Sequence, residues 1–200
     1  MRGFSDAERD RIRENLHEAG RKLFAQYGLS KTTIADLTGE VGIATSTFYR
    51  FFDSKEALYL SVLKREGDEI RRRLAESDVA DSDDPEVVVS EFLHILFDEI
   101  ETNPLISQLI VSDELDQLDS HRTAEEREKD RREETEAIRA FVDPFVESGA
   151  MYGDDPELVA RAIGAIPYLT LHEENIGPEQ YPEVRDFVIE TFARGLVADR

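Results

Sequence analysis

The stretch from Thr32 to Leu58 reads TTIADLTGEVGIATSTFYRFFDSKEAL, and its spacing predicts two short helices joined by a turn. Its first part has the apolar spacing of a short helix, preceded by threonines that can cap the first turn. Gly42 follows, and glycine takes a positive φ in a tight turn without steric cost. A further short helix is expected from about Thr45 to Phe51. A helix, a glycine turn and a second short helix have the spacing of a helix-turn-helix, whose second helix lies in the major groove of DNA.

Helices are predicted over almost the whole chain. Ser5 and Glu8 form a capping-box pattern, and Gly28 is expected to stop the helix that follows. Ser54 is placed to cap a long helix over about residues 55–76. Later helices are expected over about residues 85–100, 105–111, 120–147, 156–169 and 182–196. Most of them start at or directly after a proline, which is favourable at the first helical position.

The predicted fold class is therefore all-α, with about nine helices and no recognisable strand or internal repeat. We expect residues 1–54 to form a helix-turn-helix domain and residues 55–200 to form a second helical domain.

Charge is distributed unevenly along the chain. The net charge is −21, but residues 1–74 hold 14 Lys and Arg against 12 Asp and Glu, a net of +2. Residues 75–200 hold the other 10 basic and 33 acidic residues, a net of −23. Such asymmetry is typical of a chain whose parts have different partners. The acidic part would be repelled by DNA at low salt, so we expect it to point away from a duplex.

Several classes of protein are disfavoured by the sequence. There is no cysteine, which excludes disulfides and thiol catalysis, and no apolar run long enough to span a membrane. The N-terminus lacks the apolar core of a signal peptide, so a cytoplasmic location is expected. No nucleophile–base pair and no phosphate-binding glycine loop is recognisable, so we expect neither enzymatic activity nor a cofactor.

The segment quoted above resembles the DNA-binding motif of TetR-type (TetR/AcrR) transcriptional regulators, and the resemblance covers roughly residues 8–75. The positions that match the family pattern are Thr32, Thr33, Ile34, Asp36, Leu37, Gly42, Ile43, Thr47, Phe48, Tyr49, Phe52 and Ser54 to Leu58.

Four positions depart from the family pattern. Ala44 stands where the family often has a capping serine, which costs the following helix about 1 kcal/mol unless Thr45 takes over the cap. Thr45 stands where lysine is common, Phe51 where histidine is usual, and Ala35 where a basic residue is often found. Cationic groups are thus fewer at the expected interface than in the family.

Short uncharged side chains are therefore expected to contact DNA, while rings hold the helix in place. Hydroxyl and methyl groups can contact base edges, and the Tyr49 phenol can reach a phosphate, as the resemblance implies. Phe48, Phe51 and Phe52 are expected in the core. Lys55 lies in a first helical turn, which suits phosphate binding. The residues predicted to bind DNA are Thr32, Thr33, Thr45, Ser46, Thr47, Tyr49 and Lys55.

The resemblance also implies a homodimer formed by the last two helices, a pocket for a small apolar or amphipathic effector, and repression as the regulatory output. The candidate dimer residues are Val159, Ala162, Ile163, Ile166, Val188 and Phe192, with core packing inside one chain as the alternative for each. The candidate pocket walls are Phe92, Ile95, Leu96, Leu105, Leu109, Phe141, Phe145 and Tyr168, which could equally be plain core.

Two other functions stay open at this point. His94 and Asp98 have the i, i+4 spacing of metal ligands, and His172 is followed by two glutamates, but no third convergent ligand is recognisable. The chain could also be a helical adaptor that binds proteins and has lost affinity for DNA, since cations are few around Thr45.

The acidic surplus and the scarcity of lysine, five against nineteen arginines, lead to a prediction about salt. We hypothesise that the protein comes from a halophilic organism, because at about 1 M salt exposed carboxylates are screened beyond roughly 3 Å. Unfolding measured across a KCl series should then show a marked gain in stability toward molar salt. A fold that is equally stable at low salt would contradict the hypothesis.

Overall fold

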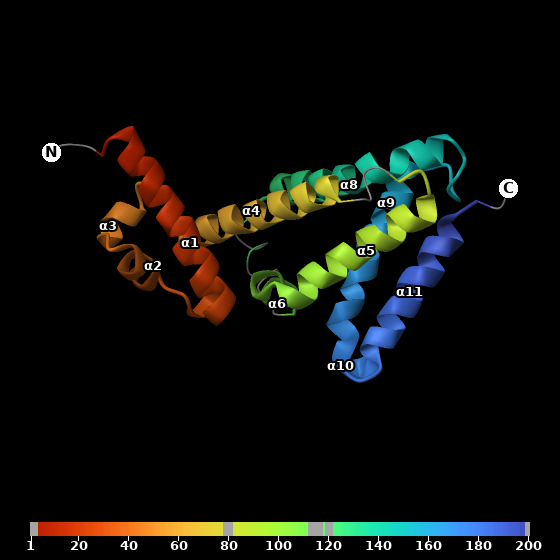
Figure 1. Ribbon diagram of the computed structural model, residues 1–200. Coiled ribbons are helices and arrows are strands. Elements are labelled where there is room, and N and C mark those ends of the chain that lie inside the picture. Colours follow the sequence, from red (N-terminus) through yellow and green to blue (C-terminus); the bar gives the residue numbers. More distant parts are fainter. Residues whose placement is uncertain (1–3, 78–81, 112–117, 119–121, 199–200) are drawn as a thin grey trace. The chain divides into compact units, whose positions relative to one another are not determined.

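The computed structural model describes residues 4–77, 82–111, 118 and 122–198. Within these ranges the regular structure is helical (Figure 1), apart from an isolated antiparallel bridge between Met151 and Val197. The all-α prediction is confirmed.

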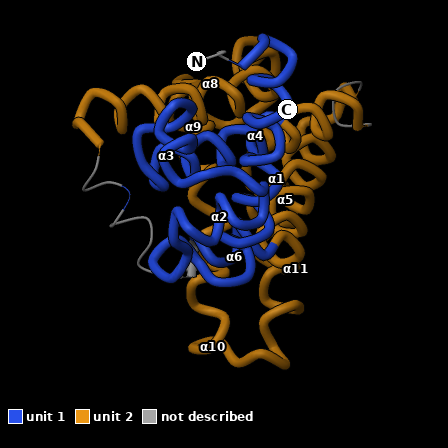
Figure 2. The backbone as a smooth tube through the Cα atoms, turned by 90° about the vertical axis from the view of Figure 1, so that its left-hand side faces the viewer, with its two compact units in different colours: residues 1–68, 104–121 blue, residues 69–103, 122–200 orange. Residues whose placement is uncertain are grey.

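The chain divides into two compact units (Figure 2). One unit takes residues 1–68 and 104–121, and the other takes residues 69–103 and 122–200. The single helix α4, Lys55–Glu76, contributes residues to both units. The domain boundary expected after residue 54 stays a prediction.

The first unit is built from short and long helices around the helix-turn-helix. Besides the first part of α4, its helices are α1 (Asp6–Lys31), α2 (Ile34–Val41), α3 (Thr45–Phe48) and α6 (Pro104–Val111).

Local signals in the sequence set the ends of α1 and α2. Ser5 and Glu8 form the predicted capping box, in which each side chain bonds the backbone amide of the other residue. Gly28 has φ 76°, so regular helical geometry breaks where a stop was expected, although one more turn follows to Lys31. Thr33 caps α2, and Gly42 ends it in the left-handed conformation with φ 74°.

The helix α3 is shorter than predicted. It ends at Phe48, and a turn carries the chain on, with the amides of Phe51 and Phe52 bonding the Phe48 carbonyl. Ala44 precedes the helix and makes no side-chain cap. So short a helix is not stable by itself, and it depends on packing against its neighbours.

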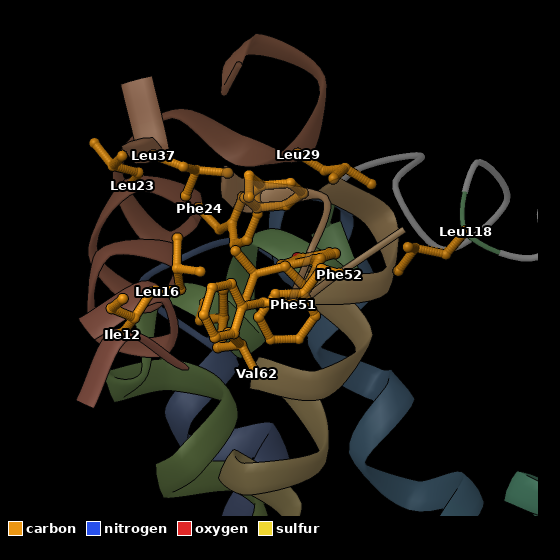
Figure 3. Packing of buried hydrophobic residues seen from close by; sticks show 14 residues of the cluster. Ile12, Leu16, Leu23, Phe24, Leu29, Leu37, Phe51, Phe52, Val62 and Leu118 are labelled. Carbon is orange, nitrogen blue, oxygen red and sulfur yellow. The ribbon is translucent and has the colours of Figure 1, made fainter. Parts of the chain in front are cut away.

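That packing comes from a core rich in aromatic rings (Figure 3). Phe48, Phe51 and Phe52 are buried together with Phe24 and Tyr59. The apolar side chains that complete this cluster are Ile12, Leu16, Leu23, Leu29, Leu37, Leu58, Val62, Leu105 and Leu118.

Gly20 lets α1 approach α4 within this core. A Cβ atom at Gly20 would lie 3.2 Å from Phe24 and 3.3 Å from both Leu58 and Val62. The absence of a side chain there therefore permits close contact between the two helices.

A buried histidine bridges the same two helices. The His17 Nδ1 atom lies 2.9 Å from the Arg13 carbonyl, and Nε2 lies 2.8 Å from the Ser61 hydroxyl. Since a carbonyl only accepts, Nδ1 donates, and in the neutral ring Nε2 accepts from Ser61. The ring also meets Phe52 edge-on at 5.4 Å between centroids. Burial lowers the pKa of His17, more strongly than the carbonyl of Arg13 raises it.

The second unit packs longer helices around a separate core. Its helices, besides the end of α4, are α5 (Pro85–Thr102), α8 (Ala124–Glu147), α9 (Pro156–Ala165), the 3₁₀ helix η2 (Ile166–His172), α10 (Glu173–Ile176) and α11 (Tyr181–Leu196).

The starts of α5 and α9 follow the predicted signals, whereas α8 begins at Ala124 after the Thr123 cap, later than the start expected at about residue 120. Asp84 and Asp155 cap α5 and α9, each directly before a proline. The helix expected over residues 156–169, however, changes to 3₁₀ geometry at Ile166. Pro167 lacks an N–H, so it cannot continue the α-helical ladder.

The core of the second unit contains the apolar faces of α5, α8, α9 and α11. Its buried members are Leu74, Val89, Phe92, Leu93, Phe97, Val142, Val146, Met151, Val159, Ala160, Ile163, Ile189 and Ala193. One buried carboxylate, Glu99, accepts from Arg73 and from Asn103, each at 2.5 Å. These bonds attach the end of α4 to α5.

His17 should make the stability of the protein depend on pH. The folded state keeps the ring neutral, while the unfolded chain takes up a proton below the usual histidine pKa of about 6.5. The stabilisation is therefore complete above that pH and is lost as the pH falls toward the lower pKa of the folded state. Urea unfolding between about pH 7.5 and 5.5 should show a smaller loss of stability in His17→Gln than in the unsubstituted protein. Equal losses would contradict the assignment.

Candidate nucleic-acid interface

The outer side of α3 carries short polar side chains and one ring. Thr45 and Ser46 are exposed, Thr47 is half-buried, and Tyr49 is 56% exposed. Phe48, on the opposite side, is fully buried. Contact of these side chains with DNA stays a prediction, but their exposure is the condition that such contact requires.

Rings behind α3 set its position. Phe48 packs against Phe52 with centroids 5.9 Å apart, and it meets Tyr49 edge-on at 5.7 Å. The buried ring of Phe48 thus contacts both the core and the ring of the exposed Tyr49. The outer face of α3 is held from behind by apolar contacts and not by ion pairs.

Thr32 and Thr33 have different surroundings although they are neighbours. Thr32 is buried, and its hydroxyl donates to the Gly28 carbonyl at 2.7 Å, which completes the hydrogen bonding at the break in α1. Thr33 is exposed, and its hydroxyl accepts from the Asp36 amide at 3.2 Å while it donates to the Asp36 carboxylate at 2.6 Å. Of the two, Thr33 has the more accessible side chain.

Lys55 makes contacts that the sequence did not indicate. Its ammonium group donates to the carbonyls of Leu29 at 2.6 Å and Thr32 at 2.9 Å, and it lies 3.4 Å from the Ser30 carbonyl. Carbonyls at the end of a helix lack partners in the helix and carry its negative dipole, so a cation is favourable there. Lys55 therefore joins the start of α4 to the connection between α1 and α2, which leaves little capacity for a phosphate.

A shallow, open hollow of about 460 Å³ lies beside these residues. Its lining comes from the starts of α2 and α4 and from Tyr49. First-turn amides and the positive end of a helix dipole favour anions. Two carboxylates, Asp53 and Glu56, also line the hollow and oppose an anion at low salt. The complete lining is Thr32, Thr33, Ile34, Tyr49, Asp53, Ser54, Lys55 and Glu56.

The predicted pocket walls do not lie in one cluster. Leu105 and Leu109 belong to the core of the first unit, whereas Phe92 and Phe141 pack together in the second, with ring centroids 5.8 Å apart. Ile95, Leu96 and Phe145 pack against the second core too, but Tyr168 is 52% exposed.

The predicted dimer residues are mostly turned inward. Val159 and Ile163 are buried in the core of the second unit, and Ile166 and Phe192 pack against it. Ala162 and Val188 are half-buried. The large apolar side chains of α9 and α11 that are exposed, Leu158 and Phe187, were not singled out by sequence reasoning, because helical periodicity does not tell the inner from the outer edge of an apolar stripe.

Metal chemistry receives no support from the part of the chain that the structure describes. Those residues contain no group of three or more His, Asp or Glu side chains that could hold a metal ion. Among the described helices, none is both long and apolar enough to cross a membrane.

Part of the chain is similar in sequence to known bacterial regulatory proteins. Residues 16–62 match the model of bacterial regulatory proteins of the tetR family. Over 83 residues the chain is 34% identical to YuxN of Bacillus subtilis, described as an uncharacterized HTH-type transcriptional regulator; this match covers 42% of the chain and 28% of YuxN.

Solved structures match over nearly the full length. A TetR-family transcriptional regulator from Pectobacterium atrosepticum is 19% identical, with a TM-score of 0.76 and coverage of 98% of this chain and 99% of that one. RolR in complex with resorcinol is 16% identical, with a TM-score of 0.64 and coverage of 98% and 92%. The structural likeness shows the fold, the sequence similarity to the tetR-family model is confined to residues 16–62, and the chain spans less than a third of the length of YuxN in that match.

Lys55 gives a prediction for this site. Lys55→Met removes the ammonium donor from the carbonyls of Leu29 and Thr32, so it should lower the free energy of unfolding by about 1–3 kcal/mol. Lys64→Met, an exposed position on the same helix, serves as the control and should change it by less than about 0.5 kcal/mol. Equal effects in denaturant unfolding would mean that the Lys55 contacts contribute nothing.

Proposed function

We propose that this protein is a homodimeric transcriptional regulator that binds DNA through α3 and is released by a small effector. The observation that carries the proposal is the division of α3 into an exposed hydroxyl-bearing face and a buried ring, Phe48. A face of this kind fits the major groove, where donors, acceptors and methyl groups of the bases are accessible.

Binding through neutral groups has a physical advantage for so acidic a chain. A protein that makes 6–10 phosphate contacts loses roughly 10³–10⁵ in affinity between 50 and 200 mM salt. Contacts from Thr45, Ser46 and Tyr49 to base edges and phosphates depend less on ionic attraction. Dissolved salt also screens charges, so it weakens the repulsion between the phosphates of DNA and the acidic second unit.

The interface can be tested with DNA from upstream of the protein's own gene. Thr45→Ala combined with Tyr49→Ala should weaken binding at least about tenfold, since a lost base contact from Thr45 costs about 1–3 kcal/mol and a lost hydrogen bond from Tyr49 to a phosphate costs a similar amount. Thr102→Ala, an exposed threonine on α5, is the matched control and should bind as the unsubstituted protein does. Fluorescence anisotropy at raised salt measures both. Undiminished binding by the double variant would refute the interface.

The same measurement separates this proposal from its alternative. A helical adaptor without DNA affinity would bind no duplex at any salt, and the carboxylates of Asp53 and Glu56 beside the hollow are the feature that favours it. Specific binding to the upstream DNA would exclude that alternative.

A second copy of the chain is the proposed occupant of the exposed face of α11. Val184, Phe187, Val188 and Thr191 follow one another at helical spacing, and Phe187 is 68% exposed. Copies that each carry a net charge of −21 repel one another, so an uncharged stripe is the surface where they can meet. A two-fold dimer would present two recognition helices to a pseudo-palindromic operator.

Phe187→Glu should therefore convert the dimer to a monomer, because it places two charges in the centre of an apolar contact. Val87→Glu adds the same charge at an exposed position of α5 and should leave the dimer intact. Sedimentation velocity distinguishes the two masses. A dimer that persists in Phe187→Glu would remove α11 from the interface.

An effector is proposed for the second unit, whose core combines aliphatic side chains with Phe92 and Phe141. RolR, which shares the fold, was solved with resorcinol, and apolar and aromatic side chains of this kind suit a small apolar or amphipathic molecule. Repression is the proposed regulatory output, and it would end when the effector releases the protein from the DNA. Loss of the anisotropy signal on addition of such compounds supports this part of the proposal, and a full screen without release would contradict it.

A further inference from the structure

Three arginines of the first unit lie over aromatic rings. The Arg9 guanidinium is 5.7 Å from the centre of the Phe51 ring, and the Arg13 guanidinium is 5.3 Å from the centre of the Phe52 ring. Arg50 lies 4.7 Å from the centre of the Phe4 ring. All three arginine residues are exposed. Cation–π contacts hold each group in place at its inner side.

None of the three forms an ion pair within 4 Å with a described carboxylate, although the chain has 45 acidic residues. Arg21 and Arg65, in the same unit, pair with Glu66 at 2.6 Å and Glu14 at 2.7 Å. In the second unit, ion pairs within 4 Å are made by Arg72, Arg73, Arg122, Arg131, Arg139, Arg161, Arg185 and Arg194.

The rings connect these arginines to α3. Phe51 and Phe52 follow the turn after α3, and Phe4 packs against Phe51 with ring centroids 6.3 Å apart. Arg50 directly follows Tyr49, the exposed ring of the candidate interface. Arg9, Arg13 and Arg50 are therefore connected to the α3 interface through one aromatic cluster.

The positive charge of a guanidinium on a ring is not offset by a neighbouring negative charge, unlike that of a guanidinium paired with a carboxylate. Its N–H groups point outward in the plane of the group, and they can donate two parallel bonds to one phosphate. The ring contact limits the motion of the side chain before binding, which lowers the entropic cost of ordering it. Arg9 and Arg13 are one helical turn, about 6 Å, apart on α1 and can serve separate phosphates.

We propose that Arg9, Arg13 and Arg50 form a binding patch for the phosphodiester backbone of DNA, anchored on Phe4, Phe51 and Phe52. The inference rests on the proposed DNA-binding function and extends it: α3 contacts the bases with neutral groups, and this patch supplies the ionic contacts.

Salt dependence tests the patch without knowledge of the operator, since phosphate contacts form on any sequence. The probe is a short fluorescent duplex of arbitrary sequence, titrated by anisotropy across a KCl series. Each of Arg9→Gln, Arg13→Gln and Arg50→Gln should make the slope of log affinity against log salt shallower by about 0.9, and the triple variant by about 2.7. Arg65→Gln, whose guanidinium is paired with Glu14, is the matched control and should leave the slope unchanged.

Further measurements separate the possible causes. Arg50→Lys keeps the charge and should keep the slope, whereas a role in folding alone would appear as a lower unfolding midpoint with no change in slope. If the unsubstituted protein binds and the Gln variants keep its slope, the patch is refuted while the proposed function stands. If the unsubstituted protein binds no duplex at any salt, the proposed function itself fails. Gln variants that change the sedimentation coefficient instead would assign the patch to a contact between copies, which also overturns the proposal.

Discussion

The burial of three rings, one in α3 and two just after it, holds the recognition helix in the first unit. α3 has four residues and no side-chain cap, so its own hydrogen bonds cannot hold it in one place. Phe48, Phe51 and Phe52 fix it from behind, against α1 and α4. Apolar burial is not weakened by salt screening, unlike attraction between exposed charges, and this suits a protein whose other part carries most of a large negative charge.

The groups that contact the arginine side chains differ along the chain. In the second unit, arginines such as Arg131, Arg139 and Arg161 form ion pairs with carboxylates, so the net charge at those points is close to zero. At the start of α1 and the end of α3, aromatic rings take the place of the carboxylates. Positive charge is thus kept available where a polyanion is proposed to bind, although the sequence as a whole is strongly acidic.

The fold could be predicted from local signals because those signals act within a few residues. The Ser5–Glu8 capping box, the left-handed Gly42 and the proline starts after Asp84 and Asp155 all fix helix ends by short-range geometry. The exposed face of α3 was also visible in the sequence, since Thr45 and Ser46 are small and polar while Phe48 is not.

What escaped prediction depends on contacts between distant residues. Lys55 donates to carbonyls 23 to 26 positions earlier, and no local pattern indicates such a partner. Leu105 could not be assigned to the first core because its helix lies far from α1 in the sequence. The outward orientation of Phe187 likewise depends on which neighbours cover α11.

The uninterrupted course of α4 has a mechanical consequence. It is 22 residues long, about 33 Å, with Lys55 attached at its first residue and Arg73 held by Glu99 near its last. Residues 55–68 of this helix belong to the first unit and residues 69–76 to the second, so a break in its backbone hydrogen bonds would act on both units at once.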